Sequence, residues 1–322
     1  MIQKPESYIR DLVKKRCVSL PVLKIHDMKL NIYRTLHRRT GLRKEDIEIV
    51  KFLETASSYD QYQNLIKEVN YSSDGELNTY TNYQYDEQRK LLVSAMYDGE
   101  NVLCQKSEYS YDNNMLVKQN DFFGEEAMEY TTVFVYENNL IIREEAYEDD
   151  EFLSIQKEYF YKDGKCIKLI EYDEFEKIQY IHLFTYDNKG LLIQRVREEV
   201  QAKDRRTYEI TYNENNLKIK ELTYNFDNIL IEAKYYDYNA DLQLVEEEEE
   251  NLDNYKKTIY TYYQKKLILS ETVDKEGKIT QKTEFEYDSD GNECYIKMYQ
   301  KDEVDPEELR MFIEVEYERI NE

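Results

Sequence analysis

The chain has 322 residues, with 33 tyrosines, no tryptophan, 8 glycines and 3 prolines. Its formal net charge of −24 at pH 7 argues against nucleic acid and anionic lipid as partners, because like charges repel. Four scattered cysteines without CxxC spacing favour a reducing compartment, and no apolar run has the length of a signal peptide or a membrane span, so a cytoplasmic location is expected.

Residues 1–56 lack the pattern that fills the rest of the chain, and we predict that they form a small helical or mixed N-terminal cap. Residues 7–16 carry apolar side chains at helical spacing. Residues 44–53 place acidic side chains before an apolar run, which predicts a second helix. Residues 22–36 also alternate like a strand. Open repeat arrays need such caps at their ends.

The same segment is basic and offers a possible contact surface. Arg38 and Arg39 follow His37 and lie close to Arg43 and Lys44 in the sequence. The leading interpretation is a role in capping, and contact with nucleic acid through this cluster is the alternative.

Residues 57–322 repeat a unit of about 25 residues, in which two aromatic or apolar residues are separated by one residue and followed by an acidic turn. Such a period indicates a repeat architecture. Residues two apart share one face of a strand, and Asp, Asn and Gly favour turns. The pairs are Tyr83/Tyr85, Tyr109/Tyr111, Phe134/Tyr136, Tyr159/Tyr161, Phe184/Tyr186, Ile210/Tyr212, Tyr236/Tyr238, Tyr260/Tyr262, Phe285/Tyr287 and Val315/Tyr317.

A second turn lies about half a period after each pair, so every repeat is predicted to contain two strands. About ten repeats then give a mainly β domain. We expect a long antiparallel meander sheet that curves or spirals because its strands twist. The tyrosines are expected to lie together on the concave or inner face.

The recurring Tyr-x-Tyr-Asp, the turn and the aliphatic restart resemble the YD repeats of bacterial RHS-type proteins. They are also similar to hairpin arrays in some bacterial immunity and antitoxin proteins. The resemblance covers residues 59–317 and implies a sheet of β-hairpins. In RHS proteins the repeats form a hollow shell around a toxin segment, whereas this chain has too few repeats for an obvious closed shell.

The charge is distributed unevenly along the chain. Of the 44 basic and 68 acidic residues, 13 and 7 lie in residues 1–56, which leaves 31 and 61 in the repeats. The repeats therefore carry a charge of −30, which favours a basic protein partner, although solubility alone could also explain it. The densest acidic run is interpreted structurally as a solvated hairpin end, and an electrostatic contact with such a partner is the functional alternative. It comprises Glu246, Glu247, Glu248, Glu249 and Glu250.

No motif of a common enzyme class occurs, and the three histidines lie far apart. Asp288, Asp290 and Asn292 offer oxygens at alternate positions, but a glycine at the fourth position of this run does not fit an EF-hand. A turn is the preferred interpretation there. We therefore expect no catalytic residue, no metal and no cofactor.

These features predict a non-enzymatic protein-binding repeat protein, and an immunity or antitoxin-like neutraliser of a basic toxin is the leading hypothesis. The second hypothesis is a scaffold or regulatory subunit of a bacterial toxin-delivery or phage-defence complex. The third is a carbohydrate-binding or carbohydrate-active protein in which tyrosines contact the sugar.

Overall fold

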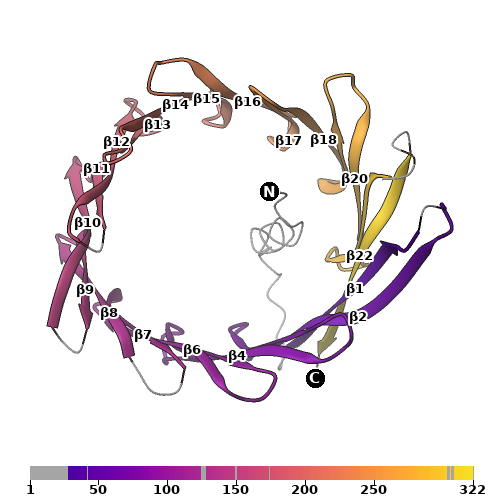
Figure 1. The fold of residues 1–322 in the computed structure, drawn as a ribbon, viewed down its shortest axis with the longest axis horizontal. Helices are drawn as coiled ribbons and strands as arrows, with labels where there is room; N and C mark the ends of the chain where they lie inside the picture. Colours follow the sequence, from indigo (N-terminus) through magenta and orange to yellow (C-terminus); the bar gives the residue numbers. More distant parts are fainter. Residues whose placement is uncertain are drawn as a thin grey trace.

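The computed structural model describes residues 28–41, 43–124, 128–148, 151–173, 175–302, 305 and 308–321. They form one antiparallel sheet of 22 strands that runs around a ring (Figure 1). The strands are β1 Met28–Arg39, β2 Ile47–Tyr59, β3 Leu65–Tyr71, β4 Leu77–Tyr85, β5 Leu91–Asp98, β6 Leu103–Asp112, β7 Met115–Phe123, β8 Met128–Glu137, β9 Leu140–Glu148, β10 Glu151–Lys162, β11 Lys165–Tyr172, β12 Ile178–Tyr186, β13 Leu192–Glu199, β14 Asp204–Tyr212, β15 Lys218–Tyr224, β16 Leu230–Tyr238, β17 Leu244–Asn251, β18 Tyr255–Tyr263, β19 Lys266–Val273, β20 Ile279–Tyr287, β21 Glu293–Lys301 and β22 Leu309–Asn321.

The sheet is a closed barrel, so the expectation of an open or spiralling meander with a cap is wrong. Each strand pairs with the next one along the chain, and β1 also pairs with β22, from Met28 opposite Asn321 to Leu36 opposite Ile313. We call the contacts of β1 and β2 with β21, β22 and the turn between them the seam. The seam joins the two ends of the sheet, which gives both β1 and β22 a neighbour on each side.

The predicted helix at residues 44–53 is also wrong, because the described residues contain no helix. Residues 47–53 belong to β2, which pairs with β1 on one side and β3 on the other. Ile47, Ile49 and Leu53 alternate as a strand requires, and β-branched side chains favour a strand. Residues 28–36 are likewise part of β1. The helix expected at residues 7–16 lies outside the described residues.

The turns between strands have the backbone geometry and the hydrogen bonds that their Asn, Asp and Gly residues favour. Asn113-Asn114 and Asn138-Asn139 have positive φ at both positions, the geometry of a two-residue hairpin turn that fits the twist of the strands. At the longer turns an Asp or Asn side chain accepts backbone hydrogen bonds from residues two and four positions later. Asp86 Oδ1, for example, accepts the amides of Gln88 and Lys90, each at 2.8 Å. At these longer turns the Asp or Asn that follows the tyrosine therefore closes the turn.

The cross-strand register places the first members of the aromatic pairs on one face, which we call the first face. Tyr83 lies opposite Ser94, which lies opposite Ser107, and the series continues through Asp121. The sheet is one layer thick, and no large side chain in the described residues is less than 2% exposed. The buried apolar cluster is at the seam, where Ile296, Ile313 and Val315 pack together on the first face.

Candidate functional site

Eight of the tyrosines that end the repeat pairs each connect their own hairpin to the preceding one. Tyr186 Oη, for example, donates to the carbonyl oxygen of Cys166 at 2.9 Å, and burial raises the pKa of Tyr186. Where Asp86, Asp187 or Asp288 follows the tyrosine, the Tyr-Asp pair has two structural tasks: the hydroxyl joins adjacent hairpins and the carboxylate closes the turn. The tyrosines with this bond are Tyr85, Tyr111, Tyr136, Tyr186, Tyr212, Tyr238, Tyr262 and Tyr287.

The basic residues near the N-terminus form ion pairs with acidic residues near the C-terminus. Arg39 pairs with Asp302 between β21 and β22, and Arg310 Nε lies 3.4 Å from the same carboxylate. All three side chains are nearly buried. Lys44 Nζ lies 2.9 Å from Asp305 Oδ2 and from Glu308 Oε1, although these side chains are more exposed. Part of the charge asymmetry thus serves the closure of the sheet.

The two predicted contact residues Arg38 and Arg39 differ in their surroundings. Arg38 reaches Ser73 Oγ at 3.3 Å and stays at the exposed surface, whereas Arg39 is held in the buried ion pair. Arg38 therefore remains available to a partner. Arg39 instead stabilises the folded chain through its ion pair with Asp302.

The acidic run Glu246, Glu247, Glu248, Glu249 and Glu250 lies within β17 and not at a hairpin end. Its side chains alternate between the two faces of the sheet, because successive strand residues point to opposite sides. Several have partners in neighbouring strands: Glu246 is 2.7 Å from Lys257, and Glu249 is 3.1 Å from Lys256. The five residues therefore do not form one continuous acidic surface.

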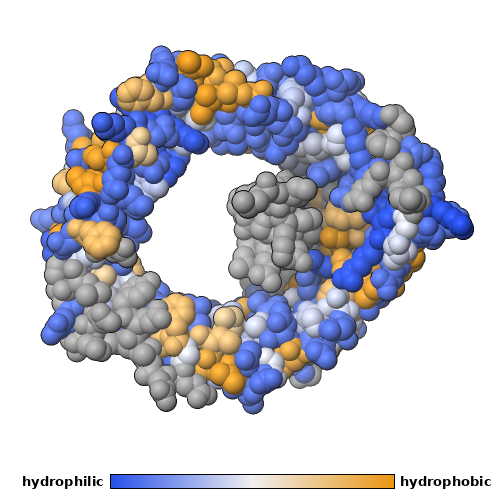
Figure 2. Space-filling model, viewed as in Figure 1, coloured by the Kyte–Doolittle hydropathy of each residue, from blue (hydrophilic) through white to orange (hydrophobic). Residues whose placement is uncertain are grey.

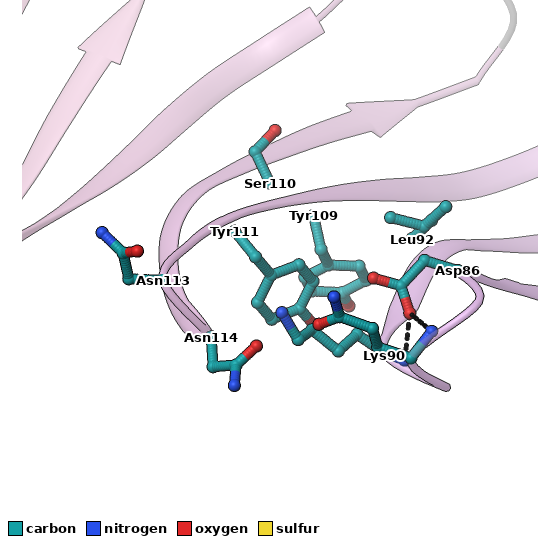
Figure 3. A pocket seen from close by; sticks show the side chains of 9 residues that line it. Asp86, Lys90, Leu92, Tyr109, Ser110, Tyr111, Asn113 and Asn114 are labelled. Carbon is teal, nitrogen blue, oxygen red and sulfur yellow. Dashed lines mark hydrogen bonds between the residues drawn. The ribbon is translucent and has the colours of Figure 1, made fainter.

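A surface hollow of about 710 Å³ lies beside the Tyr109/Tyr111 pair (Figure 3). Leu92 and the two tyrosines supply apolar surface, while Lys90 Nζ lies 5.1 Å from the centre of the Tyr111 ring. Polar groups at its rim come from two turns, and they include Asp86, Gln88, Asn113 and Asn114. Aromatic rings beside amide and carboxylate groups can contact a sugar.

The most buried carboxylates on the first face have local hydrogen-bond partners. Asp121 Oδ1 accepts from Ser107 Oγ at 2.6 Å and from Gln119 Nε2 at 3.0 Å. Glu144 accepts from Lys157 Nζ at 2.9 Å and from Tyr159 Oη at 2.5 Å. Burial and this hydrogen bond raise the pKa of Tyr159. These contacts fit a structural role.

Two histidines lie in the described residues, on different parts of the ring. His37 Nε2 is 2.6 Å from Glu314 Oε1 at the seam. His182 lies on β12, and burial lowers its pKa, with Glu171 acting in the opposite direction. Within the described ranges, no three His, Cys, Asp or Glu side chains are arranged to hold a metal ion, and Cys104, Cys166 and Cys294 are free thiols.

One cluster lies outside every group that the sequence pattern singled out. Arg195 and Arg197 on β13 share the first face with His182 on β12 and Arg206 on β14. The spacing of Arg195 and Arg197 was a usable signal, since residues two apart on a strand point the same way. Their position beside Arg206 on the same face depends on the register between strands, which the sequence does not show.

The visible surface of the ring is largely hydrophilic, with separate apolar patches (Figure 2). Among the described residues, no helix is long and apolar enough to cross a membrane.

No protein-family model and no curated protein matches the chain. Similar solved structures include a TcdB2-TccC3-Cdc42 crystal structure, with 15% identity and a TM-score of 0.37, and a TcdB2-TccC3-TEV crystal structure, with 14% and 0.36. The first match covers 77% of this chain and 15% of the other, the second 76% and 15%. A porin-like protein from Bacteroides uniformis matches over 93% of this chain and 99% of its own, with 10% identity and a TM-score of 0.32. All three TM-scores are below 0.5, and none of these matches assigns a family or a function.

Proposed function

We propose that this chain is a non-enzymatic cytoplasmic protein that binds a basic protein partner through side chains of its acidic ring. Neutralising a cationic toxin, in the manner of an immunity or antitoxin protein, is the role that this chemistry suits best. The observation that carries the proposal is the combination of a closed sheet with a large surplus of carboxylates.

Closure limits the ways in which a partner can be recognised. An open sheet can add a strand from another chain through its unpaired edge. Here β1 pairs with both β2 and β22, so the described sheet offers no such edge. A partner must therefore be bound through side chains or turns, and their charge decides which partners are attracted.

Local ion pairs leave most of the acidic surplus in place. Lys257 pairs with Glu246 at 2.7 Å, Lys282 with Glu284 at 2.7 Å and Lys297 with Glu286 at 2.7 Å. Residues 57–322 contain 31 basic against 61 acidic residues, so one-to-one pairing within this range leaves 30 carboxylates. Such a field speeds the approach of a cationic protein and repels an anionic one.

The test begins with capture of the partner on the full-length chain by cross-linking and mass spectrometry. Association of the isolated partner is then measured by biolayer interferometry at about 50 and 300 mM salt. We expect the association rate to fall about tenfold or more, because screening shortens the range of electrostatic attraction. An acidic or neutral partner with salt-independent association would refute the proposal. A basic partner that is toxic when expressed alone identifies a neutraliser.

A pair of double variants can identify the contact face. Glu246 and Glu248 point to one side of β17, while Glu247 and Glu249 point to the other. Replacing either pair with glutamine removes the same charge. We expect only the pair on the contact face to slow association, provided that thermal unfolding shows both variants to be folded. Equal rates for both would place the contact away from β17.

The scaffold hypothesis makes a different prediction for the same capture experiment. A scaffold or regulatory subunit of a toxin-delivery or phage-defence complex would retain several partners in fixed proportion, none of them inhibited by binding. Native mass spectrometry of the captured complex separates this outcome from one-to-one binding of a toxin.

Carbohydrate binding is favoured by one specific feature, the hollow beside Tyr109 and Tyr111. A glycan array with the full chain tests it. The Tyr109→Ala variant should lose any sugar binding, whereas Tyr263→Ala, which removes an exposed tyrosine elsewhere, should not. A role of this hollow in sugar recognition is excluded if the array shows no binding or if Tyr109→Ala binds normally.

A further inference from the structure

A row of basic side chains crosses three neighbouring strands on the first face. The register sets His182 on β12 directly opposite Arg197 on β13, and Arg197 directly opposite Arg206 on β14. Arg195 lies two residues from Arg197 and therefore on the same face. Residues directly opposite in an antiparallel pair have Cβ atoms about 5 Å apart. Two arginines in that arrangement repel each other.

Two tyrosines orient the central guanidinium groups. The Arg195 guanidinium carbon lies 4.2 Å from the centre of the Tyr208 ring, and that of Arg197 lies 4.2 Å from the centre of the Tyr180 ring. A guanidinium stacked on a ring keeps its N–H groups in the plane free to donate outward. The stacking therefore fixes the donors before any ligand arrives.

The carboxylates near this row do not form ion pairs with the two arginines of β13. Three carboxylates lie near the row on the first face. Glu171 Oε1 is 3.0 Å from His182 Nε2, and Asp204 Oδ2 is 3.6 Å from Arg206 Nε. Glu199 lies two residues from Arg197 on β13 and opposite Asp204 on β14. Among the described residues, Arg195 and Arg197 have no carboxylate within ion-pair distance, and the buried Nε of Arg195 has no hydrogen-bond acceptor.

This arrangement is costly unless a ligand compensates it. A cross-strand pair of like charges is destabilising, and a buried donor without an acceptor loses its hydration. The rest of the chain is rich in acidic residues, so a local partner could easily have been supplied. An oxyanion placed between Arg195, Arg197 and Arg206 would satisfy the donors and relieve the repulsion.

We propose that Arg195, Arg197 and Arg206 bind the phosphate group of a small molecule on the first face of β13 and β14. Guanidinium groups match phosphate oxygens with two parallel hydrogen bonds each. A small anion responds mainly to this local positive field. A long nucleic acid would extend over the acidic surface that surrounds the row, and repulsion there would oppose its binding.

Isothermal titration calorimetry of the full chain tests the proposal with three separate probes: inorganic phosphate, pyrophosphate and a single-stranded DNA of eight nucleotides. We expect pyrophosphate to bind more tightly than phosphate, because it offers more oxygens to three arginines. The DNA should bind more weakly than pyrophosphate at the same salt concentration. Tighter binding of the DNA would overturn the small-molecule assignment, and no heat with phosphate or pyrophosphate would overturn the site.

Neighbouring arginines on β14 supply a matched control. Arg206→Gln changes the first face, while Arg205→Gln makes the same charge change on the opposite face. We expect Arg206→Gln and Arg197→Gln each to weaken pyrophosphate binding about tenfold, as the loss of a charged hydrogen bond does. Arg205→Gln should stay within about twofold of the parent. If Arg205→Gln and Arg206→Gln weaken pyrophosphate binding equally, the anion is attracted by overall charge and the proposed site on the first face is refuted.

Thermal unfolding without ligand distinguishes binding from a structural role. Arg206→Gln should leave the melting temperature unchanged or raise it, because it removes the repulsion with Arg197. A marked fall in the melting temperature would show that the row stabilises the fold and would contradict the proposal. Since Arg206 is at the end of the row and partly exposed, this variant remains usable if Arg197→Gln fails to fold.

Discussion

The seam and the repeats beside it hold neighbouring strands together by different means. In the repeats, a tyrosine hydroxyl reaches a backbone carbonyl 18 or 20 residues earlier, so each hairpin is joined to the one before it. At the seam, side chains from the two ends of the sheet meet, with separations such as the 277 residues between His37 and Glu314. We call the repeats from β3 to β20 the wall. The wall is built from local, repeated contacts, whereas closure of the ring depends on a single set of distant contacts at the seam.

The last repeat shows this change in detail. Tyr287 Oη still donates to the carbonyl oxygen of Leu267, one repeat earlier. The corresponding carbonyl in the next repeat, Glu293, accepts instead from Arg319 Nη1 at 2.9 Å. Burial raises the pKa of Tyr317 strongly, which fits its position beside the apolar cluster. Charged and apolar contacts thus take over where the ring closes.

The largest effect is expected from the buried ion pairs at the seam. Asp302→Ala removes the carboxylate that Arg39 and Arg310 share and leaves both guanidinium groups nearly buried. We expect a loss of about 3–5 kcal/mol in the free energy of unfolding, measured by urea denaturation. Asp241→Ala breaks an exposed pair with Lys265 and should cost less than about 1 kcal/mol. Equal losses in the two variants would show that the buried ion pairs at the seam stabilise the fold no more than an exposed pair in the wall.

Two buried isoleucines allow a comparison of apolar packing in the two regions. Ile313 is 6% exposed at the seam and packs in the buried cluster, whereas Ile170 is 7% exposed in the wall on β11. Replacing Ile313 with alanine should cost about 3 kcal/mol or more because it opens a cavity among buried neighbours. Ile170→Ala should cost less, and chemical denaturation measures both. A larger loss at Ile170 would show that the cluster does not hold the ring closed.

A smaller effect is expected from the hydroxyl bonds in the wall. Tyr186→Phe keeps the ring and removes the donor to the Cys166 carbonyl, so about 1 kcal/mol should be lost. Tyr263→Phe changes an exposed tyrosine and serves as the control. Differential scanning calorimetry on both variants measures the difference. A Tyr186→Phe variant as stable as the control would mean that the ring alone, and not the hydroxyl, connects the hairpins.

The sequence reveals the wall much better than the seam. The tyrosine pairs, the turn residues and the alternation predict antiparallel hairpins, and the described strands are antiparallel throughout. Closure could not be predicted in this way, because no local pattern states that β1 pairs with β22. The available signal was the basic character of residues 1–56 beside an acidic remainder. That asymmetry indicates an external partner when the sequence is considered alone, whereas the structure uses part of it to join the two ends.

The candidate sites were harder to predict for a related reason. Glu246 to Glu250 look like one acidic surface in the sequence, but a strand directs alternate members to opposite faces. Arg195, Arg197 and Arg206 look unremarkable in the sequence, and only the register between β13 and β14 brings them together. Residue clusters on a sheet depend on pairing between strands, which composition cannot reveal.

The smallest expected effect concerns pH at the seam. Glu314 accepts hydrogen bonds from Tyr295 and His37, and although burial opposes them, the net result is a pKa below the ordinary value for glutamate. A carboxyl whose pKa is depressed in the folded state adds stability above its unfolded pKa of about 4.3 and loses that contribution as the pH falls through the folded value. The parent should therefore be more stable than Glu314→Gln at pH 7, and this advantage should shrink below about pH 4. Urea denaturation at pH 7, 5 and 3.5 measures the two curves. A constant difference across this range would show that ionisation of Glu314 does not help to hold β22 against β1.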